Sequence, residues 1–191
     1  IEWERPEGGG ACRFVADASL YTFNREARRA LALRGFSMDT APLELNRREL
    51  GERGMDGSEM IVYGRLPMMV SAQCVRKTVR ACAAGDGASK NAGKEPAGEL
   101  FLSDGKRFSF PVKQYCRSCY NVIYNNAPLW LAEELPAIAA LGTRMVRLSF
   151  TMEGPEEVSG VIRAFAAALE GREYGGAPKL RTRGHFRRGT E

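Results

Sequence analysis

Short apolar runs alternate with amphipathic stretches along most of the chain, and glycines or prolines mark many of the changes. The apolar runs predict strands at residues 18–24, 41–46, 59–64, 121–125 and 145–151. Helical spacing predicts helices at residues 25–35 and 155–171, and a further amphipathic segment covers residues 128–142. Strands that alternate with helices are typical of a parallel sheet. We therefore expect an α/β protein that forms the C-terminal part of a (β/α) barrel of parallel strands.

Residues 65–120 interrupt this alternation. Within them, the Gly-, Ala- and Lys-rich stretch 86–98 predicts a loop, and two alternating runs around Asp104–Gly105 predict a β-hairpin at 99–112. We therefore expect a cysteine-bearing insert that leaves the barrel after one strand and returns at the next. The expected divisions are a severed linker (1–17), a partial barrel (18–175) with its insert (65–120), and a basic C-terminal arm (176–191), all belonging to a longer chain.

Composition indicates the class of protein and its expected location in the cell. With 44% hydrophobic and 27% charged residues among 191, the chain has the composition of a globular domain. It contains no apolar run of about 18 residues and no signal-peptide pattern, so we expect a cytoplasmic protein without a membrane partner.

The net charge of +5 is concentrated at the end of the chain, where the last residues carry several arginines against one acid, Glu191. Such an arm can lie on phosphates, which makes RNA a candidate partner. Charge alone is equally consistent with a solvated tail.

Four of the five cysteines bracket the insert, at Cys74, Cys82, Cys116 and Cys119, whereas Cys12 stands apart. Disulfides are rare in a reducing compartment, where clustered thiols point to a metal or to catalysis. The pattern C-x7-C-x33-C-x2-C places two thiols on each side of the hairpin and predicts a metal site. The alternative is four unrelated buried cysteines, and we expect Cys12 to be an ordinary small hydrophobic residue.

The spacing bears on which metal is bound. Structural zinc sites usually pair two tight C-x2–4-C knuckles. If the segment from Cys74 to Cys82 were one straight helix, its two Cα atoms would lie roughly 12 Å apart. Because a 4Fe–4S cluster presents its ligand positions at separated corners, the spacing favours a cluster over zinc, which remains the alternative.

Four stretches of the chain resemble a known family. These are EMIVYGRLPMMVSAQCVRKTVRAC, FPVKQYCRSCYNVIYNNAPL, RLSFTMEGPEEV and TRGHFRRGTE. They look like the distal part of the long members of peptidase family U32, the collagenase-like peptidases. One departure matters: YGRLPMM stands where short members have HGALC, so roles adjacent to that motif cannot be carried over to Leu66, Pro67 or Met68.

The resemblance implies a (β/α) barrel with a four-cysteine 4Fe–4S site. It also implies one of two activities, because some members are described as collagen-degrading peptidases and others act in RNA modification. The second group, which this chain resembles more, takes part in 5-hydroxylation of a pyrimidine in tRNA or rRNA, with prephenate implied as the co-substrate. A non-catalytic structural barrel domain is a further alternative.

The residues themselves disfavour a peptidase. Peptide hydrolysis needs an activated nucleophile or a metal-bound water. His185 is the only histidine, so there is no HExxH motif, and a Cys–His pair would have to use the thiols of the expected cluster. Ser71 and Ser118 lie in no GxSxG motif.

Candidate substrate- or RNA-binding residues lie around the strand at 121–125 and in the arm. Asn121 and Asn125 could read a base edge, and Tyr124 could stack on a base. Asn125 could instead cap the turn before Pro128. The basic or aromatic candidates for contacts with RNA are Arg65, Arg183, His185 and Arg187.

Two residues of the last strand region are catalytic candidates. Arg147 alternates with its neighbours so as to point into the expected barrel, where it could bind a dicarboxylate such as prephenate. Its alternative role is a structural ion pair with Glu44 or Glu153. Glu153 lies just past the C-terminal end of a strand, which is where barrel enzymes place their chemistry.

Overall fold

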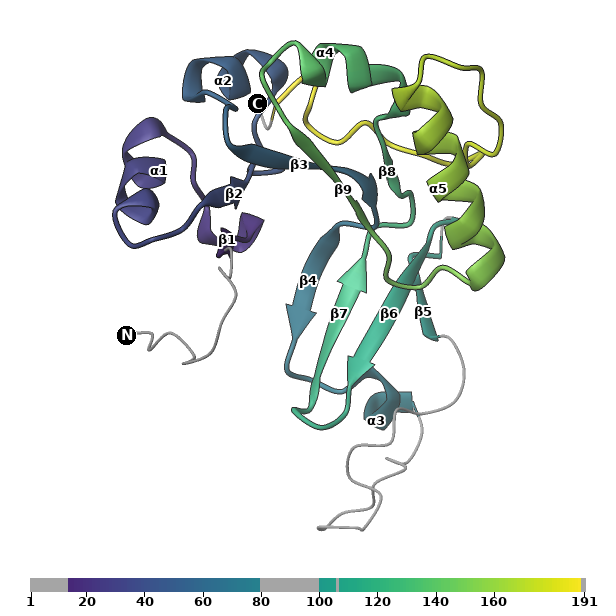
Figure 1. Ribbon diagram of the computed structural model, residues 1–191. Coiled ribbons are helices and arrows are strands. Elements are labelled where there is room, and N and C mark those ends of the chain that lie inside the picture. The colour runs from purple at the N-terminus through teal and green to yellow at the C-terminus, as the bar shows by residue number, and fades with distance from the viewer. Residues whose placement is uncertain (1–13, 80–99, 106, 190–191) are drawn as a thin grey trace, which may run out of the picture. The chain divides into compact units, whose positions relative to one another are not determined.

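A computed structural model describes residues 14–79, 100–105 and 107–189. Its helices are α1 (Arg25–Ala32), α2 (Arg47–Arg53), α3 (Val75–Val79), α4 (Leu135–Ala139) and α5 (Pro155–Leu169), with short 3-10 turns at Ala18–Leu20 (η1) and Ala132–Glu134 (η2). Its strands are β1 (Val15–Ala16), β2 (Met38–Thr40), β3 (Ser58–Gly64), β4 (Pro67–Ser71), β5 (Leu100–Ser103), β6 (Ser109–Tyr115), β7 (Tyr120–Tyr124), β8 (Leu129–Trp130) and β9 (Met145–Ser149), as Figure 1 shows.

The strands form two sheets. In the first, the order is β1-β2-β3-β8, and β9 also pairs with β3. The pairs β1–β2 and β2–β3 are parallel, whereas β8 runs antiparallel to β3, so this sheet is mixed. The second sheet has the order β4-β7-β6-β5, and all of its pairs are antiparallel. We call it the hairpin sheet.

The expected (β/α) barrel of parallel strands is therefore wrong. In the described ranges there is no closed barrel, and the strand expected to return to the barrel, NVIYN, is β7 at the centre of the antiparallel hairpin sheet. The physical reason is local. After Gly64 the chain leaves the first sheet and enters β4 of the hairpin sheet, and Ser118 closes the turn between β6 and β7 by donating its N–H to the Tyr115 carbonyl at 3.1 Å. The hairpin predicted at 99–112 is present as β5–β6, with Gly105 at φ +73°.

Other expected strands shift or change type. Residues 18–20 form a 3-10 turn, and the expected strand at 41–46 is replaced by β2 at 38–40. The helices expected at 25–35 and 155–171 are present as α1 and α5. None of the described helices has the length and apolar character needed to cross a membrane.

The chain divides into two compact units, and the division falls within β3 and β9. The first unit contains the described residues up to Ile61, Pro136–Arg147, and those from Gly184 onward. The second unit contains Val62–Leu135 and Leu148–Arg183.

A buried charge network organises the first unit. The Asp39 carboxylate accepts hydrogen bonds from the Thr22 and Ser58 hydroxyls, both at 2.6 Å, and pairs with the buried guanidinium of Arg53. Burial lowers the pKa of Arg53, and the charge of Asp39 opposes that shift. Because a buried charge without a partner is costly, this network fixes α2 against β2 and β3. The start of α2 is a capping box between Asn46 and Glu49.

An aromatic cluster forms the core of the second unit. Tyr63 from β3, Trp130 from β8 and Phe165 from α5 are almost fully buried, and the Trp130 and Phe165 rings lie 4.9 Å apart. Gly64 follows Tyr63 at φ +144°, where a Cβ would lie only 2.5 Å from the Ser149 carbonyl oxygen. The close approach of β3 to β9 at this point therefore requires glycine.

Candidate functional site

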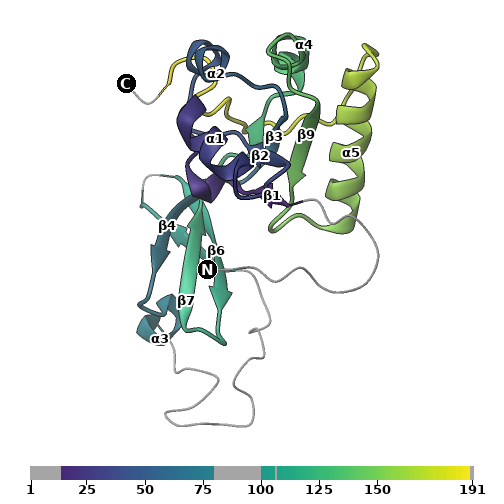
Figure 2. The ribbon, with the colours of Figure 1, turned by 60° about the vertical axis from the view of Figure 1, so that its left-hand side comes forward.

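The described cysteines gather at one end of the hairpin sheet. Across the neighbouring strands β4, β7 and β6, one row is formed by Ser71, Asn121 and Gln114. Cys74 follows Ser71 by three residues, Cys116 follows Gln114 by two, and Cys119 precedes Asn121 by two. Figures 1 and 2 both place α3, which begins directly after Cys74, at the same end of the sheet as the β6–β7 turn. Register alone therefore brings three thiol-bearing positions to one edge.

A buried amide network lies beneath this edge. The Asn121 side chain is 1% exposed, and its Nδ2 donates to the carbonyls of Gln73 (2.8 Å) and Ser71 (3.4 Å). These two contacts turn its Oδ1 toward Gln114, whose Nε2 donates to it at 3.3 Å. The same Nε2 lies 3.7 Å from the Cys74 sulfur. The network thus holds the loop before α3 and directs an N–H donor at a candidate ligand.

The β6–β7 turn carries the other two thiols in a tight conformation. Cys119 adopts φ +52°, a left-handed conformation that is uncommon for residues other than glycine, and its Sγ lies 3.7 Å from the Cys116 carbonyl oxygen. At the base of the turn, the rings of Tyr115 and Tyr120 stack with centroids 4.6 Å apart. Cys119 is exposed and Cys116 is partly buried, so both can be reached from solvent.

The described residues alone do not complete a metal site. Within residues 14–79, 100–105 and 107–189, no group of three or more histidine, cysteine, aspartate or glutamate side chains is arranged to hold a metal ion. Cys82, the fourth expected ligand, and Cys12 lie outside the described residues. The described residues provide three thiols at one end of the hairpin sheet, and the side-chain amide of Gln114 faces one of them, that of Cys74.

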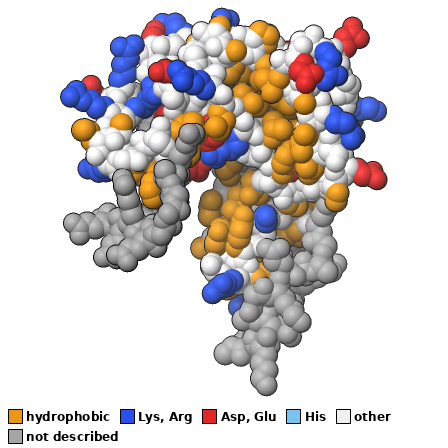
Figure 3. All heavy atoms as spheres, viewed as in Figure 1, with side chains coloured by type: hydrophobic (Ala, Val, Ile, Leu, Met, Phe, Trp, Pro, Cys, Tyr) orange, Lys and Arg blue, Asp and Glu red, His pale blue; other side chains and the backbone are white. Residues whose placement is uncertain are grey.

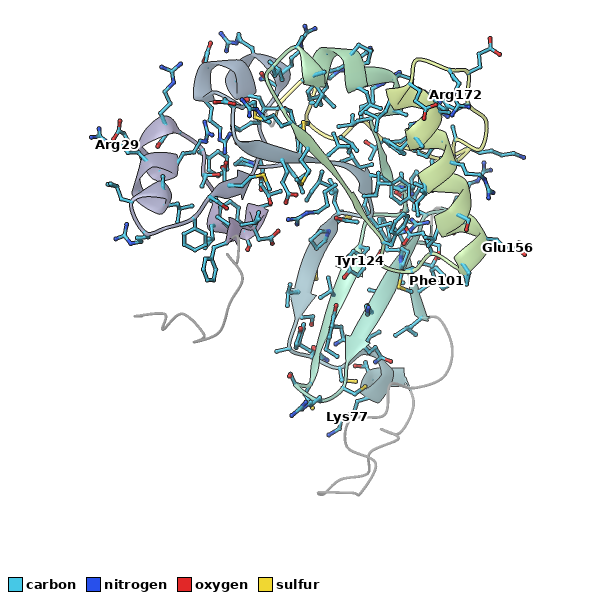
Figure 4. All side chains as sticks on the ribbon, viewed as in Figure 1. Arg29, Lys77, Phe101, Tyr124, Glu156 and Arg172 are labelled. Carbon is cyan, nitrogen blue, oxygen red and sulfur yellow. The ribbon has the colours of Figure 1, made fainter. Side chains whose placement is uncertain are left out.

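A second group of predicted residues meets at a small pocket of the second unit. Arg65 and Glu153 both line a hollow of about 160 Å³, together with Phe101, Pro111, Met152 and Glu157 (Phe101 is labelled in Figure 4). Both charged groups already have local partners. The Arg65 guanidinium donates to the carbonyls of Asn125 and Asn126, at 3.2 and 2.6 Å.

The Glu153 carboxylate is similarly engaged. It accepts from the backbone N–H groups of Thr151 (2.6 Å) and Met152 (3.0 Å) and from the Tyr63 hydroxyl (3.3 Å). Burial, and then the charge of Glu153, raise the pKa of Tyr63. Glu153 therefore organises the turn after β9, and the pocket beside it is lined by both charged and apolar side chains.

Two more of the predicted binding residues, Asn125 and Tyr124, make contacts that support the fold around β7. Asn125 accepts weakly from the Ala127 N–H at 3.4 Å and donates its own backbone N–H to Leu66, which agrees with a turn-forming role. Tyr124, labelled in Figure 4, is 7% exposed, and burial raises its pKa. Its ring is packed inside the protein and offers little surface for a base.

Arg147 belongs to the first unit and forms ion pairs there. Its guanidinium donates to Asp17 at 2.7 Å and to the Thr40 hydroxyl at 3.0 Å, and it pairs closely with Glu59. Burial opposes its charge, but these carboxylates raise the pKa of Arg147 overall. Arg147 thus forms ion pairs with Asp17 and Glu59, in place of the Glu44 or Glu153 considered from the sequence. Glu153 lies in the other unit.

The residues of the basic arm are packed to different degrees. In the second unit, Thr182 bridges to Leu129 beside β8, and Arg183 pairs with Glu134 at 3.5 Å. In the first unit, the His185 Nδ1 lies 2.7 Å from the Gly189 carbonyl oxygen, and Phe186 is 2% exposed. The arm is therefore part of the fold. Arg187 lines a separate hollow of the first unit.

The sequence reasoning missed Gln114. The run SFPVKQY alternates, and its buried positions include Val112 and Gln114. A polar residue at an inward-facing position, two residues before a cysteine, was the signal that could have identified it.

Comparisons with known proteins found no matching family model, no matching curated protein and no matching solved structure.

Proposed function

We propose that this protein binds a 4Fe–4S cluster through Cys74, Cys82, Cys116 and Cys119, with zinc as the alternative metal. The observation that carries the proposal is the row Ser71–Asn121–Gln114, which sets three of these thiols within three residues of one line across the hairpin sheet. Thiolates suit iron–sulfur clusters and zinc alike. A bound cluster would supply either a redox centre or a cross-link between the two loops.

The test is anaerobic purification followed by an absorption spectrum and assays of iron, zinc and acid-labile sulfide. We expect a broad visible absorption band and about four irons and four sulfides per chain. Cys82→Ser should lower the metal content, whereas Cys12→Ser, the matched control, should leave it unchanged. Equal metal content in wild type and in a variant with all four cysteines changed to serine would contradict the proposal.

We further propose that the protein takes part, in the cytoplasm, in 5-hydroxylation of a pyrimidine in tRNA or rRNA, with prephenate as a co-substrate. The resemblance to the RNA-modifying U32 proteins supports this proposal, as does the set of exposed arginines in the first unit. The direct measurement is nucleoside mass spectrometry of tRNA and rRNA from cells that lack the gene. The wild-type gene should restore a 5-hydroxypyrimidine, and Cys116→Ser should not. Identical nucleoside profiles with and without the gene would exclude this function.

The geometry gives a peptidase little support. The chain has one histidine, and its Nδ1 is engaged with the Gly189 carbonyl rather than with a serine or cysteine. We expect no cleavage of gelatin or casein. Cleavage that survives serine substitution of the four cysteines but is lost in His185→Ala would instead establish a peptidase.

A further inference from the structure

An arginine-lined hollow of about 530 Å³ lies on the first unit. Its lining is Asn46, Arg47, Arg48, Gly51, Leu141 and Arg187. These residues come from the start and body of α2, from the segment after α4 and from the end of the chain. Figure 3 shows lysine and arginine side chains gathered over the region of α1 and α2. We call the hollow lined by these six residues the arginine hollow.

The arginine hollow is held in place by the backbone. Residues 185–189 form a closed turn in which the N–H groups of Arg188 and Gly189 donate to the His185 carbonyl, at 3.1 and 2.7 Å. The turn is anchored by buried Phe186, whose carbonyl accepts from the Arg47 N–H at 2.8 Å. Gly189 also lies so close to Asn46 that a Cβ there would be 2.9 Å from the Asn46 Nδ2. Backbone contacts therefore hold the turn, and Arg187 with it, beside α2. These contacts do not depend on the arginine side chains.

The described lining is basic. Among the residues that the structure describes, three arginines and no carboxylate line the hollow, and Arg47, Arg48 and Arg187 are exposed. Arg48 pairs with Glu52 at 3.9 Å, but the two side chains are 80% and 66% exposed, so this pair neutralises little. Like charges held together repel one another, and a bound anion relieves that repulsion.

Two other arginines of the arm lie in the second unit. Arg181 pairs with Glu133 at 3.6 Å, and Arg183 pairs with Glu134 at 3.5 Å, so both have acidic partners in the second unit. The arginines of the hollow lie in the first unit, around an open space that Leu141 also lines. Guanidinium groups match phosphate oxygens in geometry and remain charged at every physiological pH.

We propose that the arginine hollow binds backbone phosphates of RNA. The inference rests on the proposed action on RNA and identifies where the polymer is held. It places the contact on Arg47, Arg48 and Arg187, and it assigns Arg181 and Arg183 to the packing of the arm. The contact is to the backbone, so it is independent of base sequence.

The experiment measures binding of bulk tRNA across a salt series for the full chain and two double variants. In Arg47→Ala/Arg187→Ala, the backbone bonds that hold the turn are retained. Its matched control, Arg29→Ala/Arg34→Ala, removes the same charge from α1 and the turn after it in the same unit, where both residues are exposed (Arg29 is labelled in Figure 4). Each phosphate that the protein no longer neutralises should reduce the slope of log affinity against log salt by about 0.7 to 0.9.

We expect the reduced slope in the hollow variant and a smaller change in the control. If the wild type binds RNA and both variants show the same slope of log affinity against log salt, the arginine hollow is not the RNA-binding site. The proposed function on RNA would still stand in that case. No RNA binding by the wild type would overturn both. Polyglutamate is the non-phosphate probe, and an equal loss of polyglutamate binding in the hollow variant would overturn the assignment to phosphate. Thermal unfolding of each variant checks that the fold is retained.

Discussion

The side-chain amide of Gln114 faces the sulfur of Cys74 because its hydrogen bond to Asn121 fixes its orientation. The two carbonyls that accept from the Asn121 Nδ2 fix that amide, and its Oδ1 then requires the Nε2 of Gln114 on the facing side. A hydrogen bond to a metal ligand fixes the orientation of that ligand. Groups that hydrogen-bond to metal ligands commonly contribute tenfold to a hundredfold in affinity.

We therefore predict that Gln114→Glu weakens binding of Co²⁺, a probe of thiolate sites, by about 10- to 100-fold. The substitution keeps the shape of the side chain but removes the N–H donor and adds a negative charge. Affinity is measured from the cobalt–thiolate absorption in competition with a chelator. Gln73→Glu is the matched control, since its exposed side chain brings the same charge next to Cys74. Equal affinities in the two variants would show that charge alone is responsible.

The pair of Asp17 and Arg147 predicts a pH effect. Burial opposes ionisation, but hydrogen bonding from Arg147 lowers the pKa of Asp17 below its usual 3.8. A depressed carboxyl pKa contributes stability that is present above the usual value and is lost as the pH falls through the folded value. Asp17→Asn should thus be less stable than wild type at pH 6, by about 0.2 to 1 kcal/mol because the pair is exposed. Urea unfolding should show this difference vanish at acidic pH. A difference that persists at pH 2 would indicate another cause.

Residue types could be predicted from the sequence better than residue environments. The cysteine pattern led to positions that share one sheet edge, and Arg147 was considered for an ion pair. Its partners Asp17 and Glu59 could not be predicted, because Glu59 lies on β3, with which β9 pairs, and Asp17 directly follows β1. Asn121 was expected to read a base, yet its amide groups hold the loop before α3.

At the scale of elements, helices and the hairpin were predictable, but sheet membership was not. The segment NVIYN has the short apolar pattern of a buried parallel strand, and that pattern also suits the centre of an antiparallel sheet that is covered on both faces. What decides between them is the turn at Tyr115–Tyr120, which pairs β7 with β6. Turn chemistry without glycine gives little signal, since Cys119 occupies the left-handed position.

Gly64 is the element-scale test of the approach between β3 and β9. Gly64→Ala should destabilise the protein by about 1 to 3 kcal/mol or more, because the added Cβ meets the Ser149 carbonyl oxygen at a backbone conformation that suits only glycine. Gly160→Ala in α5, where a Cβ meets nothing within 4 Å, is the opposite control and should stabilise by about 0.5 to 1 kcal/mol. Urea unfolding measures both. Equal stability of Gly64→Ala and wild type would mean that the strands do not approach so closely.

At the scale of the whole molecule, Cys74, Cys116 and Cys119 all lie in the second unit. Metal loading should therefore slow amide hydrogen exchange most strongly in residues 67–79 and 109–124, because bound ligand stabilises the elements that carry it. Exchange in α2 should change much less. Hydrogen–deuterium exchange with and without metal measures this, and uniform protection across both units would show that they unfold together.

Cys119 carries a consequence for protein engineering. A side chain at φ +52° costs roughly 1–2 kcal/mol relative to glycine, which adopts this conformation freely. Any selection for thermal robustness alone should therefore replace Cys119 with glycine and, in doing so, discard a proposed ligand. Natural proteins accept such losses of stability where activity depends on them. In a library of variants at position 119, we therefore expect glycine to give the highest heat tolerance and cysteine the highest metal content. Opposite rankings in the two screens would show that Cys119 serves metal binding at the expense of stability.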